Sequence, residues 1–191
     1  MGLLPLRVDV DVLETGSVPR PAAPVSATRL SQVRVGAYGS ALLALLYAGV
    51  SAYWTLGGTA LLSTVGGPLE DLARHPTAAA VALGAAVTAA KLLGAGLSLA
   101  LVQTWGRRLP EQPLLWTATA AAVVLTTYGG LLVVVGGLAL LGLFGPPPAD
   151  PTALRWHVMV WDLWFLLWGL LLGTAARHRR HVPSGHAPDV H

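Results

Sequence analysis

The chain is 191 residues long, 54% of its residues are hydrophobic and only 11% are charged. Soluble domains carry a charge on roughly a quarter of their residues. This composition therefore excludes disorder, a coiled coil and a nucleic-acid-binding module, and it indicates a membrane protein. Cysteine is absent, which also excludes disulfides, thiolate metal sites and thiol redox chemistry.

An N-terminal tail and four apolar runs follow one another along the chain. Residues 1–35 hold three acids, four arginines and four prolines, a composition typical of a flexible tail. The predicted transmembrane domain, residues 36–176, has spans at residues 36–62, 77–105, 114–144 and 156–176, and a basic C-terminal tail follows at 177–191. Each run reaches the roughly 20 residues that a helix needs to cross a hydrocarbon core. Because backbone groups find no water there, these spans are predicted to be helices and the fold class all-α.

Arginines are distributed unevenly between the two sides of this predicted bundle. The N-terminal tail, the second loop and the C-terminal tail hold nine of them, whereas the first and third loops hold only Arg74 and Arg155. Cytoplasmic flanks of membrane spans are enriched in Lys and Arg. We therefore predict a multi-pass protein of the cell membrane with both termini cytoplasmic. Its basic charge implies contact with membrane lipids and requires no nucleic acid.

Two charged side chains lie inside the predicted spans, Lys91 in the second and Asp162 in the fourth. A charge at this depth costs about 2.5–3.5 kcal/mol on insertion scales, so such residues face the bundle interior and are often functional. Each charge shares its helix face with small residues, which are suited to helix contact. The face of Lys91 carries Gly84, Thr88, Ala95 and Ser98, and the face of Asp162 carries Gly169 and Gly173. Two interpretations remain open: a structural ion pair, or a couple that exchanges protons or binds a ligand.

Aromatic residues at a similar depth complete the candidate site. With Asp162 as the hypothetical catalytic acid and Lys91 as a binding residue, the further predicted binding residues are Tyr53, Trp54, Tyr128, His157 and Trp161. On a regular α-helix, the stripe that begins with His157 and Trp161 lies roughly 130° around from Asp162. This spacing favours an aromatic seam or interfacial belt over a ring of indoles around the acid. No cluster of His and carboxylates has metal-ligand spacing, so we expect neither a metal nor a cofactor.

Two aromatic motifs resemble those of a known family. They are the stretch 47–58, whose core is Tyr-Trp-x-Leu-Gly-Gly at 53–58, and Trp-Asp-Leu-Trp-Phe-Leu-Leu-Trp-Gly at 161–169. Both are similar to signatures of a family of small four-helix bacterial membrane proteins, common in actinobacteria and catalogued as a domain of unknown function, DUF3995. The similarity covers about residues 36–176. It implies topology and membrane location, and it brings no established activity.

Three functions are compatible with these residues, and whether the chain is an enzyme stays open. The first is binding of an apolar or lipid-like ligand, or of a partner membrane protein, near Asp162 and Lys91, as a homo-oligomer or an accessory subunit. The second is a membrane-embedded acid–base enzyme in which Asp162 protonates an isoprenoid or lipid substrate to start a cyclisation. The third is a small proton-coupled transporter, for which four helices are few unless the protein dimerises.

Overall fold

The computed structural model describes residues 27–143 and 150–180, and all of its secondary structure there is helical. Four helical stretches in this part are long and apolar enough to cross a membrane. They are α1 (Ala27–Thr55), α3 (Ala78–Ala100), α4 (Glu111–Leu140) and the continuous run of α5 (Pro151–Trp156), η3 (His157–Trp161) and α6 (Asp162–Arg179). The predicted all-α, four-span fold is therefore confirmed.

Short helices form part of the loops between these spans. They are η1 (Leu62–Thr64) and α2 (Gly67–Arg74) in the first loop and η2 (Thr104–Arg108) in the second. The structure describes none of residues 1–26, 144–149 and 181–191. Most of the predicted N-terminal tail and most of the C-terminal tail therefore lie outside the described residues.

Helix ends differ from the predicted span limits because glycines stop two of the helices early. After α1, Gly57 adopts a left-handed φ of 94°, its N–H donates to the Trp54 carbonyl, and the Gly58 N–H donates to the Tyr53 carbonyl. These two bonds form a Schellman motif, which ends the helix at Thr55 and not near residue 62. The same motif, with Gly142 at φ 72°, ends α4 at Leu140.

Two helix starts also differ from the predicted limits. The fourth span begins at Pro151 and not at residue 156, because the Asp150 carboxylate accepts hydrogen bonds from the N–H groups of Thr152 and Ala153 at 3.0 and 2.9 Å. This is an N-terminal cap followed by a proline at the first helical position. At the other end of the chain, α1 begins at Ala27, inside the region predicted to be a tail.

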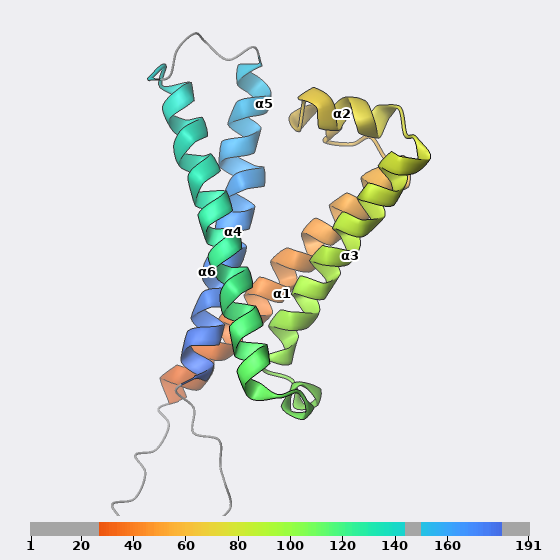
Figure 1. The fold of residues 1–191 in the computed structure, drawn as a ribbon. Coiled ribbons are helices and arrows are strands. Elements are labelled where there is room, and N and C mark those ends of the chain that lie inside the picture. The colour runs from red at the N-terminus through yellow and green to blue at the C-terminus, as the bar shows by residue number, and fades with distance from the viewer. Residues whose placement is uncertain (1–26, 144–149, 181–191) are drawn as a thin grey trace, which may run out of the picture.

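The four spans form a V (Figure 1). In one arm α1 packs along α3, in the other α4 packs along α5 and α6, and the arms meet where α1 packs against α6. The start of α1, the end of α6 and η2 lie at the narrow end, and α2 and the start of α5 lie at the wide end. Both described chain ends are thus on one side of the bundle. Which side faces the cytoplasm stays a prediction.

Small side chains let the helices approach closely toward the narrow end. The buried cluster there consists of alanines and leucines, among them Ala37, Ala118, Ala122 and Leu172. On α6, a Cβ at Gly169 would lie 2.6 Å from the Thr126 backbone nitrogen, so only glycine fits this contact with α4. Between α1 and α3, the buried hydroxyls of Ser40 and Ser98 share a 2.7 Å hydrogen bond.

Candidate functional site

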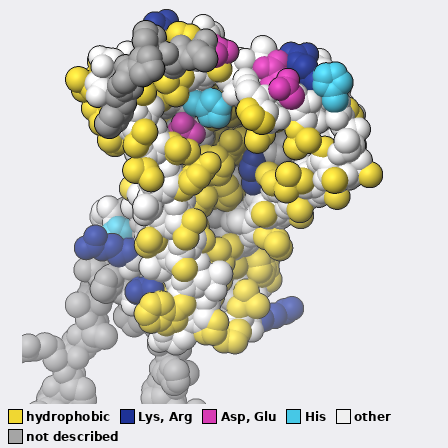
Figure 2. Space-filling view, turned by 45° about the horizontal axis from the view of Figure 1, so that its top comes forward, with side chains coloured by type: hydrophobic (Ala, Val, Ile, Leu, Met, Phe, Trp, Pro, Cys, Tyr) yellow, Lys and Arg dark blue, Asp and Glu magenta, His cyan; other side chains and the backbone are white. Residues whose placement is uncertain are grey.

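A cavity of about 670 Å³ lies between the two arms of the V and reaches the wide end. Figure 2 shows the hollow with hydrophobic side chains around it and with acidic, basic and histidine side chains near it. Its volume falls within the roughly 300–1,000 Å³ that is usual for small-molecule sites. The lining residues come from all four spans and from the first loop with its helices η1 and α2, and most of them are apolar.

Lys91 forms a buried positive charge on the α3 wall of this cavity. Its side chain is 8% exposed, and Nζ donates a 2.5 Å hydrogen bond to Ser51 Oγ on α1. Nζ also lies 3.4 Å from the centre of the Tyr47 ring, a cation–π contact that partly replaces the water the ammonium has lost. All three residues line the cavity.

Asp162 and His157 lie next to each other in the opposite arm. Asp162 is 6% exposed, and its Oδ1 lies 3.7 Å from His157 Nδ1. The other ring nitrogen, Nε2, lies 2.9 Å from the Val65 carbonyl oxygen. Because a carbonyl can only accept, Nε2 carries the proton of that bond, and the contact with Asp162 becomes an ion pair when Nδ1 is protonated as well.

A π-helical turn brings His157 to Asp162. On a regular α-helix, residues five apart are separated by about 140° around the axis. Residues 157–161 instead form a π-helix, in which the wider turn places residue i+5 close to the face of residue i. The expected separation of His157 from the acid was therefore wrong, because it assumed uniform α-helical geometry. Trp161, which directly precedes Asp162, lines the cavity with both of them.

Aromatic rings form one packed cluster on the side of the cavity where Asp162 lies. Tyr47 is stacked on Trp161 with centroids 5.9 Å apart and contacts Phe165 at 5.0 Å. Trp54 meets Trp161 edge-on at 5.4 Å. Phe165 in turn meets Tyr128 of α4 edge-on at 5.3 Å. Rings from three spans therefore present faces and edges to the same space.

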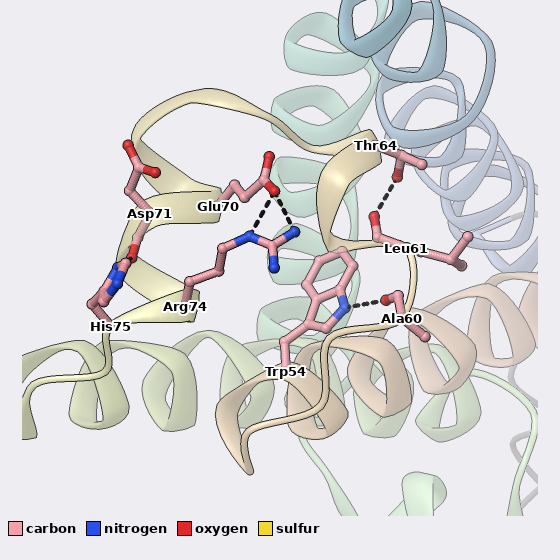
Figure 3. Close-up of polar contacts among 8 residues, drawn as sticks. All are labelled: Trp54, Ala60, Leu61, Thr64, Glu70, Asp71, Arg74 and His75. Carbon is pink, nitrogen blue, oxygen red and sulfur yellow. Dashed lines mark hydrogen bonds and ion pairs between the residues drawn. The ribbon is translucent and has the colours of Figure 1, made fainter.

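The first loop covers the wide end of the cavity. Leu69 and Leu72 of α2 line it, while Arg74 pairs with Glu70 at 2.6 Å. Figure 3 shows this pair on the side of α2 that faces Trp54, with Asp71 on the other side of the helix. Trp54 Nε1 donates to the Ala60 carbonyl at 2.8 Å. An amphipathic helix thus lies over the cavity, and side chains hydrogen-bond to the loop beside it.

A comparison with models of protein families tests the resemblance that the motifs at 47–58 and 161–169 indicated. The family described as "Protein of unknown function (DUF3995)" matches residues 42–172. The chain belongs to the DUF3995 family. No curated protein and no solved structure gives a significant match to it. Every residue that lines the cavity, from Tyr47 to Phe165, falls within the matched DUF3995 region.

Most of the predicted site residues lie on one cavity of this DUF3995 protein. They are Trp54, Lys91, Tyr128, His157, Trp161 and Asp162. Tyr53 does not line it: the side chain is 47% exposed, and its hydroxyl accepts a 3.3 Å hydrogen bond from the Ala60 N–H. Neighbouring residues on a helix point in different directions, so Trp54 lines the cavity and Tyr53 does not.

Among the lining residues that the predicted site did not include, three contact its charged or aromatic groups in the DUF3995 domain: Tyr47, Ser51 and Phe165. The first two had a detectable signal, because they share one face of α1 with Trp54 at positions i, i+4 and i+7. Phe165 lies three residues after Asp162, on the same face of α6. A search for polar and aromatic residues in register with the predicted site would have found all three.

Among the residues that the structure describes, Lys91 and Asp162 do not form an ion pair. Lys91 bonds to Ser51, and Asp162 pairs with His157. The interpretation of a direct structural Lys91–Asp162 pair is therefore not supported. In the same described ranges of the DUF3995 chain, no group of three or more His, Cys, Asp or Glu residues could hold a metal ion.

Among the described residues, the cavity is open on the side between α3 and α4. These two helices pack against α1 and α6 respectively and make little contact with each other. Several cavity-lining residues on them are also exposed, namely Leu83 at 56% and Val87 at 40% on α3, and Tyr128 at 52% and Val135 at 44% on α4. Both helices of this DUF3995 protein are long and apolar enough to cross a membrane.

Proposed function

We propose that this protein binds one apolar or lipid-like molecule in the cavity between its two arms. The observation that carries the proposal is the open wall between α3 and α4, where lining residues such as Val87 and Val135 are exposed. A molecule dissolved in the bilayer reaches the cavity through this gap without crossing water. Apolar walls with a few convergent polar groups are the usual composition of a small-molecule site.

A tryptophan inside the cavity tests this proposal. Val87→Trp adds an indole to the lining of the cavity, whereas Leu93→Trp adds one to the outside of α3, where Leu93 is 75% exposed and does not line the cavity. We expect wild type and Leu93→Trp to retain the same lipid-like molecule after purification in mild detergent, and Val87→Trp to lose most of it. Solvent extraction and mass spectrometry, normalised to protein, measure the difference.

Identical extracts from all three proteins would contradict binding in the cavity. Thermal unfolding of both variants in the same detergent supplies the folding control. Both side chains are replaced on exposed positions of α3, where substitutions usually change stability by less than about 0.5 kcal/mol.

A second function is favoured by the aromatic rings around Asp162. A carboxylic acid that donates its proton to an olefin or epoxide leaves a carbocation on the substrate, and the faces of Tyr47, Trp161 and Phe165 would stabilise that cation. The support for this function is that Trp161, the last residue of the π-helical turn, lines the same cavity as Asp162. The substrate class would be an isoprenoid or a related unsaturated lipid.

The orientation of the bundle follows from its charges. We infer that the narrow end, which carries Arg107, Arg108 and Arg179, is cytoplasmic, and that the wide end, with Arg74 and Arg155, faces outward. Alkaline phosphatase fused after residue 150 is expected to be active, and green fluorescent protein fused after residue 180 is expected to fluoresce. The reverse pattern of activities would place the cavity mouth on the cytoplasmic side.

A further inference from the structure

We propose that the ligand is a single-chain amphiphile with a carboxylate head, and that Lys91 binds this carboxylate. The inference rests on the proposed function and names the chemical class of its ligand. Lys91 is the only lysine of the chain, and its side chain is buried within a membrane span, at 8% exposure. A buried charge at this depth is costly and calls for a partner of opposite sign.

The protein itself supplies Lys91 with only part of its coordination. An ammonium has three N–H donors. Ser51 Oγ accepts one of them, and the Tyr47 ring faces the nitrogen at 3.4 Å. In the described part of the chain, no carboxylate pairs with Lys91, since Asp162 is paired with His157. The ammonium therefore has N–H donors left for a ligand in the cavity that Lys91 lines.

Charge counting favours a monoanion over a phosphate. Lys91 brings one positive charge to the cavity, and no carboxylate in the described part of the chain pairs with it. A carboxylate cancels this charge, whereas a doubly ionised phosphate leaves a negative charge in a site of low dielectric. A carboxylate also accepts hydrogen bonds from the ammonium on either of its two oxygens.

The remaining walls accommodate the hydrocarbon chain. Between Lys91 and α2 the cavity is lined by Val87 and Leu83 of α3, Leu132 of α4 and Leu72 of α2. The polar end of the ligand therefore lies deep in the membrane at Lys91. Its chain points toward the wide end or leaves through the gap between α3 and α4.

Binding of matched sixteen-carbon probes tests the head group. Palmitate, hexadecanol, hexadecyl phosphate and hexadecylamine differ only at the polar end, and each is titrated into purified protein in nanodiscs of neutral phosphatidylcholine. We expect palmitate to bind wild type at least about tenfold more tightly than hexadecanol, which is the effect of one buried charge interaction. Palmitate is also expected to bind more tightly than the phosphate and the amine.

Two substitutions assign this preference to Lys91. Lys91→Met keeps an unbranched side chain and removes a buried charge, a change that proteins often tolerate. We expect it to bring palmitate and hexadecanol to within about twofold of each other while hexadecanol affinity stays at the wild-type value. Lys91→Arg keeps the charge and is expected to retain the preference for palmitate. Circular dichroism and thermal unfolding of both variants provide the folding control.

Each other outcome overturns a stated part of the proposal. Equal affinities of wild type for palmitate and hexadecanol, or an undiminished palmitate preference in Lys91→Met, would refute the carboxylate site. Tightest binding of hexadecyl phosphate or of hexadecylamine would also refute it. If hexadecanol binds and Val87→Trp weakens it, the cavity-binding function survives that failure. If no probe binds, and Val87→Trp extracts match those of wild type, the proposed function fails as well.

Discussion

Gly129→Leu is expected to separate α4 from α6 and to prevent the protein from accumulating in membranes. A Cβ at residue 129 would lie 2.7 Å from the Asp162 carbonyl oxygen and 3.0 Å from the Leu166 Cα. Both obstacles are backbone atoms, so no side-chain rotation relieves the clash. Overpacking of a well-packed core typically costs about 1–3 kcal/mol, and we expect a value at or above the top of this range.

Gly137→Leu is the matched control on the same helix, because no atom of another element lies within 4 Å of its Cβ position. We expect this variant to accumulate like wild type. For Gly129→Leu, the purified fraction should unfold roughly 5–10 °C below wild type. Equal accumulation and equal unfolding midpoints of the two variants would show that the α4–α6 contact at Gly129 is not close. The clash involves the backbone carbonyl of Asp162, so we expect the Asp162 carboxylate to be displaced in any Gly129→Leu protein that does accumulate.

Asp162→Asn is expected to separate the two proposed functions. The amide has the shape of the carboxylate, and His157 keeps its bond to the Val65 carbonyl, so we expect normal accumulation and unfolding. Binding of an apolar molecule does not use the proton of Asp162, so co-purified lipid should be unchanged. An enzyme that uses Asp162 as its acid would lose about 10²–10⁴-fold in rate, and its product would disappear from host lipids and isoprenoids.

Asp71→Asn provides the control for this experiment. Asp71 is exposed on α2 and does not line the cavity. Loss of a metabolite in Asp162→Asn but not in Asp71→Asn would establish the enzyme. Unchanged metabolites with unchanged co-purified lipid in Asp162→Asn would refute the cyclisation and leave the binding function. Failure of Asp162→Asn alone to accumulate would instead assign Asp162 a structural role with His157.

Some details of the helix ends were predictable from the sequence, although the predicted spans missed them. Gly57 and Gly142 end their helices in left-handed conformations, and glycine is the residue that favours this position. The caps are local features, formed within five or six residues. The two glycines would have placed the ends of α1 and α4 correctly, and the Asp150-Pro151 pair would have placed the start of α5.

The geometry around Asp162 was not predictable in the same way. Hydropathy and spacing identified the acid and its aromatic neighbours, but the angle between them depends on the π-helical turn at His157–Trp161. That turn is accompanied by bonds to a distant segment, His157 to Val65 and Trp161 to Thr64. Contacts across 92 and 97 residues leave no periodic signal in one sequence.

The sequence by itself determined that this protein has four helices long and apolar enough to cross a membrane, and that two charges lie inside them. Length, apolarity and unsatisfied backbone groups in lipid suffice for that conclusion. The tertiary structure decided which partners those charges have. Lys91 bonds to Ser51 and Asp162 pairs with His157, because the two arms diverge and leave a cavity where a direct ion pair was considered. Helix packing set that divergence, because α1 meets α6 closely at the narrow end, where a Cβ at Gly36 would lie 2.7 Å from the Leu171 carbonyl oxygen.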